Sequence, residues 1–355
     1  MRHIRALMLG ITLIALVVAC VGYGLLREIS TPVSTSNEIV EFEVAEGDST
    51  SRIATKLRSA NLIRQPTLFR ALVRYKGLDG KLQAGYYQLR PSMTMSQIIS
   101  ALQNSRVEEI QFTVPEGLRL EEIAAIVGAT GVIDEAAFLA AARDADQFKA
   151  NHFLLSGIPD GGTLEGYLFP DTYRIDARAT PESVIEMMLT RFDEQYATIE
   201  RDVRVPDRSV HEIITMASVV QREAAVMSEM PQIAAVFWNR LKPENEAETG
   251  NGRLQSDPTV QYALGYSEAE GTWWRKELTL SDLEIESPYN TRQVPGLPPG
   301  PISAPGLAAI TAAAQPDESA NYLYFVASCA KDGTHHFTET FEEFQVYEAE
   351  YLACS

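Results

Sequence analysis

Near its N-terminus the chain has 21 consecutive residues without a charged side chain, Ala6 to Leu26, most of them Leu, Ile, Val or Ala. A helix of this length spans roughly 30 Å, the thickness of a bilayer's hydrocarbon core. Arg2 and Arg5 precede the run and Arg27 follows it, so the positive-inside rule favours a cytoplasmic N-terminus and an exported body. The sequence therefore predicts a cytoplasmic segment, a transmembrane anchor and a linker at residues 1–5, 6–26 and 27–39.

Two other interpretations of this run stay open. A cleaved signal peptide normally has a shorter apolar core of about 7–15 residues. A lipoprotein signal places small residues before a cysteine, and Val18-Ala19-Cys20 comes close, but the apolar run continues to Leu26. We therefore expect a retained anchor. An exported body would also permit a disulfide between Cys329 and Cys354, with two separate thiols as the alternative.

Charge and composition exclude several kinds of site. The formal net charge of −18 argues against a nucleic-acid partner, which requires a basic surface. The sequence has no Cys-x-x-Cys pair, no HExxH and no glycine-rich nucleotide motif, and its five histidines are scattered apart from His335-His336. We expect neither a metal nor a cofactor.

An internal repeat follows the linker. Val44-Ala45-Glu46-Gly47 precedes an apolar Ile-Ala pair by six residues, and Val114-Pro115-Glu116-Gly117 does the same. Each unit predicts a strand, a turn and an amphipathic helix, and Gly85–Leu89 between them is strand-like. This order resembles the LysM module, which binds the N-acetylated sugars of cell-wall glycans. We predict a small α+β LysM-like subdomain over 40–108, with a spacer domain lacking sugar affinity as the alternative.

The rest of the chain, residues 109–355, predicts a mainly helical domain with short strands, so the whole chain is expected to be α+β. Residues 322–327 have the composition of a buried strand, and His335 begins its expected partner. The Pro- and Gly-rich stretch 287–306 predicts an ordered loop rather than a regular element.

The predicted helix 211–225 carries an acid on its apolar face. Met216, Val219 and Val220 lie within about 60° of Glu223 on a helical wheel. Burial there would raise the pKa of Glu223 and keep a general acid protonated near neutral pH. The alternative is that Glu223 only marks the edge of the stripe and pairs with Arg222.

Several long motifs in a fixed order carry a family resemblance: LEGYLFPDTY, ASVVQREA, VFWNRL, RLQSDPTVQYALG, SPYNT, GLPPGPISAPG, YLYFVA and GTHHFT. Together they resemble the membrane-bound endolytic murein transglycosylases, also known as the YceG-like or MltG family, over nearly the whole chain. The resemblance implies a catalytic domain at 109–355 that acts in the periplasm from the bacterial inner membrane.

The reaction implied is cleavage of the β-1,4 bond between N-acetylmuramic acid and N-acetylglucosamine in nascent peptidoglycan. It is a lyase reaction that leaves a 1,6-anhydro end and terminates glycan elongation. Glycan strands are the implied substrate, and penicillin-binding glycan synthases are the implied partners. The family's catalytic acid is the last residue of an A-S-I-x-E-x-E pattern, which falls on Glu223.

The sequence departs from the family pattern at two places. Gln221 stands where the family often has an earlier Glu, which leaves Glu223 as the only acid of the motif. After His335, which is retained, the family's later E-H-N triplet is replaced by Glu343-Phe344-Gln345.

Other polar and aromatic residues of these motifs are expected to line the sugar groove: Glu165, Tyr167, Gln255, Asp257, Tyr289, Asn290 and Thr291. Each also has a structural interpretation, as a cap, a core residue or an ion-pair partner. Two other functions stay open. A peptidoglycan-binding scaffold would not need Glu223, and a water-using muramidase would need a second carboxylate such as Asp257.

Overall fold

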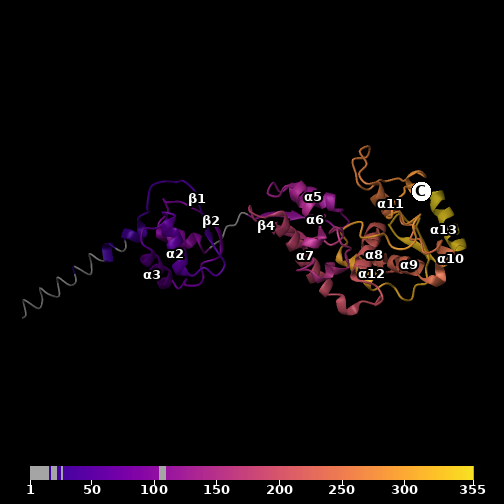
Figure 1. The fold of residues 1–355 in the computed structure, drawn as a ribbon, viewed down its shortest axis with the longest axis horizontal. Coiled ribbons are helices and arrows are strands. Elements are labelled where there is room, and N and C mark those ends of the chain that lie inside the picture. Colours follow the sequence, from indigo (N-terminus) through magenta and orange to yellow (C-terminus); the bar gives the residue numbers. More distant parts are fainter. Residues whose placement is uncertain (1–15, 17–21, 25–26, 104–108, 355) are drawn as a thin grey trace, which may run out of the picture. The chain divides into compact units, whose positions relative to one another are not determined.

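The computed structural model describes residues 16, 22–24, 27–103 and 109–354. The chain divides into two compact units, Met1–Glu109 and Ile110–Ser355 (Figure 1). Most of the predicted anchor, 6–26, lies outside the described residues. Within the described ranges, no helix is both long and apolar enough to cross a bilayer.

Between Val40 and Ala101 the first unit has an antiparallel strand pair and the helices that flank it: β1 Val40–Val44, α2 Thr50–Ser59, α3 Pro66–Tyr75, β2 Gly85–Leu89 and α4 Met95–Ala101. Val40 pairs with Leu89 and Val44 with Gly85. Its core includes Ile53 and Leu57, the apolar positions of the first repeat. The strand predicted at 85–89 is confirmed.

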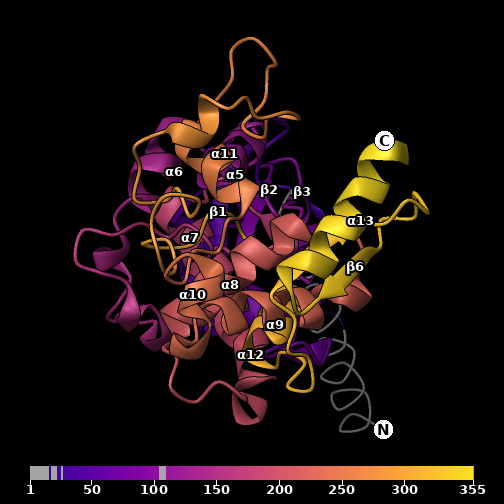
Figure 2. The same cartoon turned by 90° about the vertical axis from the view of Figure 1, so that its right-hand side faces the viewer.

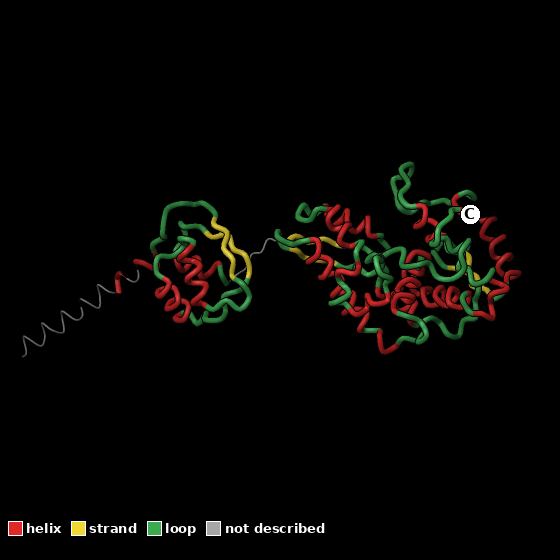
Figure 3. The backbone as a smooth tube through the Cα atoms, in the orientation of Figure 1, coloured by secondary structure: helices red, strands yellow, loops and turns green. Residues whose placement is uncertain are grey.

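Helices are the main regular elements of the second unit, and long loops connect them (Figure 3). Its strands pair as β3 with β4 and β5 with β6, both antiparallel. The elements are β3 Ile110–Thr113, α5 Leu120–Gly128, α6 Glu135–Ala142, η1 Ala145–Gln147, η2 Phe153–Gly157, β4 Thr172–Ile175, α7 Pro181–Ala197, η3 Glu200–Asp202, α8 Val210–Glu223, η4 Met227–Glu229, α9 Met230–Arg240, η5 Pro243–Asn245, α10 Glu246–Thr249, α11 Asp257–Leu264, η6 Asp282–Glu284, α12 Leu307–Ala314, β5 Tyr324–Ala327, β6 His335–Thr338 and α13 Phe341–Cys354. The predicted mixture of helices and short strands is confirmed.

Helix α8 is the central helix of this unit and packs against α9 and α12 (Figure 1). Ser209 caps its N-terminus in a reciprocal capping box with Glu212. All eight residues from Ile213 to Val220 are buried. Helix α12, with the sequence LAAITAAA, is rich in alanine, and such small side chains permit close approach of neighbouring helices. The helix carrying Glu223 is therefore fixed by core packing on all sides.

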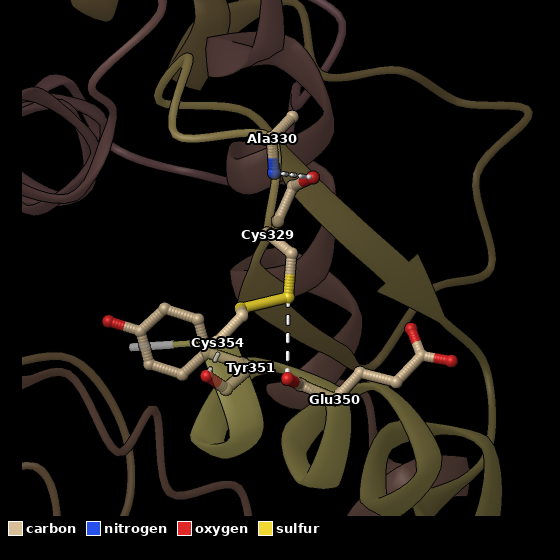
Figure 4. The surroundings of a disulfide bond; sticks show 6 residues. Cys329, Ala330, Glu350, Tyr351 and Cys354 are labelled. Atoms are coloured by element: carbon tan, nitrogen blue, oxygen red, sulfur yellow. Dashed lines mark hydrogen bonds between the residues drawn. A yellow bond between two sulfur atoms is a disulfide. The ribbon is translucent and has the colours of Figure 1, made fainter.

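The β5–β6 hairpin and α13 lie next to one another (Figure 2). The strand predicted as buried at 322–327 is shorter and only half-buried over Tyr324–Ala327. Its neighbours are the single strand β6 and the surface helix α13, none of whose side chains is buried, so they enclose β5 only in part. Cys329, in the hairpin turn, and Cys354, at the end of α13, form a disulfide (Figure 4).

Candidate active site

Glu223 is the last residue of α8 and is half-buried in the wall of a pocket of about 330 Å³. The chain leaves the helical conformation at Ala224, whose ψ of 117° is extended. The pocket is lined by Glu223, Val236, Phe237, Arg240, Leu254, Gln255, Asp257, Arg292, Leu323, Tyr324, Phe325, Phe341, Phe344 and Glu348. Three of the residues predicted for the site, Glu223, Gln255 and Asp257, therefore meet in one cavity.

The surroundings of Glu223 set its protonation. Burial raises the pKa of its carboxyl group to about 7, and the nearby charge of Asp257 acts in the same direction. The Ser256 hydroxyl donates a hydrogen bond of 2.6 Å to Oε1 and, together with Arg292 and Arg222, opposes this rise in pKa. Near neutral pH the group is thus poised both to give and to take a proton.

Asp257, the other carboxylate at this end of the pocket, is held by an arginine. It begins α11, and its Oδ1 lies 2.6 Å from Nε and 2.5 Å from Nη2 of Arg292. Asn290 Oδ1 in turn accepts a hydrogen bond of 3.0 Å from the Arg292 backbone N–H. Asp257 is therefore engaged in an ion pair at the pocket's edge rather than placed alone beside Glu223.

Gln255 has an unusual backbone and a charged partner. Its φ of 59° lies in the left-handed region, which costs free energy for a residue other than glycine and is often found at functional sites. Its Oε1 accepts a hydrogen bond of 2.6 Å from Nη2 of Arg240. Burial lowers the pKa of Arg240 to about 10, yet its guanidinium remains a cation near neutral pH. The side chains of Gln255 and Arg240 form a polar corner of the pocket.

Asn290 and Thr291 lie behind the pocket lining and are fully buried. Asn290 donates hydrogen bonds to the carbonyls of Leu283 and Ile285 at 3.0 and 2.9 Å. Thr291 Oγ1 accepts a hydrogen bond of 3.2 Å from the backbone N–H of Ser256, the residue that contacts Glu223. These two side chains order the two loops that carry Arg292 and Ser256.

The other predicted groove residues also lie outside this pocket lining. Tyr167 is fully buried, and its hydroxyl contacts Nδ1 of His211 at 2.9 Å. Glu165 is 3% exposed, and its Oε2 accepts a hydrogen bond of 3.2 Å from the Leu120 backbone N–H. Burial raises the pKa of Glu165 to about 8. Tyr289 packs on Tyr262, with ring centroids 4.8 Å apart. Direct sugar contacts by these residues stay a prediction.

The first departure from the family pattern has a structural explanation. Gln221 Oε1 accepts a hydrogen bond of 2.9 Å from the Gly306 backbone N–H at the start of α12. A glutamate carboxylate could accept the same bond, so this position ties α8 to α12 with either residue. The second repeat lies close by, because Nη1 of Arg222 donates to the Gly117 carbonyl at 3.3 Å.

Sequence reasoning missed Ser256, Arg292, Arg240 and the aromatic part of the pocket. Ser256 and Arg292 directly adjoin predicted residues in the motifs SDP and YNTR, but only the folded chain shows their bonds to Glu223 and Asp257. His335, retained from the family pattern, binds Glu229 at 2.8 Å outside the lining. In the part of the chain that the structure describes, no three His, Cys, Asp or Glu side chains gather to hold a metal ion.

Comparisons with known proteins agree with the site's motifs. The profile of the YceG-like family matches residues 42–350. A Bacillus subtilis protein named endolytic murein transglycosylase is 33% identical over 331 residues, which cover 90% of this chain and 86% of that protein. A Streptococcus pneumoniae protein of the same name is also 33% identical. The match covers 89% of this chain and 59% of that protein.

The fold has a counterpart of known structure. A crystal structure of a YceG-like protein from Listeria monocytogenes aligns with a TM-score of 0.55 and 34% identity. The alignment covers 88% of this chain and 99% of that one. Both the sequence profile and the relatives extend over most of the chain, and the chain therefore belongs to the YceG-like family.

Proposed function

We propose that this YceG-like protein is an endolytic lytic transglycosylase, a carbon–oxygen lyase that acts on peptidoglycan. It cleaves the β-1,4 bond between N-acetylmuramic acid and N-acetylglucosamine and leaves a 1,6-anhydro end, which terminates the growing strand. The family and the names of the relatives support this reaction. The observation that carries it is Glu223, a pocket carboxyl whose burial raises its pKa to about 7.

A single carboxyl group can serve both steps of this reaction. Protonated Glu223 gives its proton to the glycosidic oxygen as the bond from that oxygen to C1 breaks. The resulting carboxylate takes the proton of the muramic acid C6 hydroxyl while that oxygen bonds to C1. Glu223 ends protonated again, and no water is consumed. The hydroxyl belongs to the same sugar ring, so the attack is intramolecular and has a high effective concentration.

The Ser256 hydroxyl and the Asp257–Arg292 pair fit subsidiary roles. Ser256 orients Oε1 of Glu223 through its bond of 2.6 Å. The carboxylate of Asp257 adds negative charge near C1, where positive charge develops in the transition state. A hydrolytic muramidase would instead require Asp257 to activate a water or attack C1, and its ion pair with Arg292 restrains that use.

We also propose a membrane anchor, a LysM-like subdomain and partner proteins for this chain. Residues 6–26 anchor the protein by a single helix in the bacterial inner membrane, which leaves the catalytic domain, 109–355, in the periplasm. The strand–helix–helix–strand order of β1, α2, α3 and β2 supports a LysM-like subdomain over 40–108. Penicillin-binding glycan synthases are the partners whose product would be cut.

Mass spectrometry of digested peptidoglycan tests the reaction. The full-length protein in detergent is compared with Glu223→Gln, which keeps the size of the side chain but cannot donate the acidic proton. We expect anhydro-ended fragments, lighter by one water than hydrolysis products, from the wild type alone. Reducing-ended fragments would instead establish a muramidase. Glycan binding without fragments from either protein would establish a scaffold.

A further inference from the structure

The C-terminal helix α13 forms part of the Glu223 pocket. Phe341, Phe344 and Glu348 of this helix contribute to its lining. The rings of Phe341 and Phe344 stack at 5.9 Å and lie 5.7 and 5.5 Å from the ring of Tyr324 on β5. Together these three rings, here named the aromatic wall, give the pocket an apolar surface beside its polar groups.

Packing alone gives α13 little to hold it in place. All of its residues are described, and none of its side chains is buried. Phe341 is 46% exposed and Val346 is 59% exposed. Burial of apolar surface is the main source of packing free energy, so a helix that buries so little is weakly held. Its described neighbours include β5 and β6, and Tyr347 stacks on His336 at 4.2 Å.

The disulfide supplies a covalent attachment for this helix. It joins Cys354, at the C-terminal end of α13, to Cys329 in the β5–β6 turn (Figure 4). Such a bond confines the helix even where packing is weak, because a detached arrangement would require a broken covalent link. The two phenylalanines lie near the other end of α13, where their rings pack on Tyr324 of β5.

We propose that α13 is a substrate-binding wall held in place by the Cys329–Cys354 disulfide, and that Phe341 and Phe344 contact the sugars of the glycan strand. This inference rests on the proposed function. N-acetylated sugars present apolar C–H faces and acetyl methyl groups, which pack against aromatic rings, while their hydroxyl and carbonyl groups suit Gln255 and Arg292.

Changes to the aromatic wall and changes to Glu223 should affect different kinetic constants. Glu223 and Ser256 lie on α8 and before α11, so loosening α13 leaves the reacting groups in place. In the full-length protein, Phe344→Ala is expected to raise KM about tenfold while kcat stays within about twofold. The Cys329→Ser/Cys354→Ser double variant and the dithiothreitol-treated wild type should show the same pattern. Val346→Ala, exposed on α13 and outside the lining, is the matched control.

Binding and hydrogen exchange decide the inference without turnover. Purified glycan strands should bind Glu223→Gln about tenfold more tightly than they bind Glu223→Gln/Phe344→Ala. In Glu223→Gln, reduction should weaken glycan binding about tenfold and speed amide exchange within 341–354 about tenfold, and the serine double variant should not respond to reductant. Phe344→Leu, which keeps an apolar side chain, guards against loss of folding.

The outcomes distinguish this inference from the proposed function. Unchanged glycan affinity in Phe344→Ala and Phe344→Leu would overturn the wall. Unchanged affinity and exchange after reduction would overturn the role of the disulfide. If the wild type releases no anhydro fragments but the Phe344 variant still binds glycan more weakly, the reaction is wrong and the wall stands.

Discussion

Helices α8 and α13 both contribute to one pocket, but the chain holds them in opposite ways. Helix α8 has eight consecutive buried residues and a reciprocal capping box. Helix α13 has no buried side chain and ends in a disulfide. A general acid must be held within a narrow geometry, and core packing provides that rigidity. A surface that binds a long polymer must stay open, and a tethered surface helix permits this.

The largest expected effect follows substitution of Glu223, the acid on the packed side of the pocket. Glu223→Gln should lower kcat on the order of 10³-fold, because the amide cannot protonate the leaving oxygen. Chromatographic rates of anhydro-fragment release measure this loss. Glu244→Gln, at an exposed carboxylate outside the pocket lining, is the matched control. Residual activity near that of the wild type would show that another group supplies the proton.

A pair of truncations tests the difference in packing. Ile214→Ala removes a fully buried side chain of α8 and should cost about 3 kcal/mol of unfolding free energy. Val346→Ala, on the surface of α13, should change this free energy by less than about 0.5 kcal/mol. Denaturant titration of both variants gives the comparison. Equal losses would mean that α13 is packed as tightly as α8.

The pH dependence of stability tests a buried histidine in the packed part of the domain. His152 lies between Asp193 and Glu186, at 2.6 and 2.8 Å. Burial alone lowers the pKa of His152, but its hydrogen bonds to both carboxylates outweigh burial and raise it above 6.5.

The pKa of His152 is higher in the folded state than in the unfolded state. His152 therefore stabilises the fold fully at a pH below its unfolded-state pKa, and this stabilisation is lost as the pH rises through its folded-state pKa. We expect His152→Gln to cost about 2 kcal/mol at pH 6 and clearly less at pH 9. Thermal unfolding across this range is the measurement. A cost independent of pH would show that the histidine acts only through its shape.

The smallest expected change follows removal of the Ser256 hydroxyl, which donates a hydrogen bond to Glu223. Ser256→Ala removes the hydrogen bond that favours the carboxylate form, so the pKa of Glu223 should rise further. The decline of kcat/KM at high pH should move upward, and its maximum should fall about tenfold. A pH–rate profile records both effects. An unmoved decline would assign it to a group other than Glu223.

The same contrast explains how much the sequence could predict. Periodicity located α8 and the apolar face of Glu223, because packing against a core imposes a regular pattern. The contacts of Ser256, Arg292 and Gln221 join segments far apart in the chain, and no local pattern encodes them. The burial of Asn290 and Thr291 could not be predicted for the same reason. Helix α13 shows little amphipathic pattern because it has no buried face.

The titration of Glu223 itself tests the central claim most directly. Carbon-13 NMR of the labelled carboxyl group, with Glu223→Gln to assign its signal, follows protonation of this one side chain in the full-length protein. We predict a midpoint near pH 7, set by burial against the hydrogen bond from Ser256. A midpoint near the ordinary value of 4.5 would contradict the account, because the acid would then be ionised before the glycan arrives.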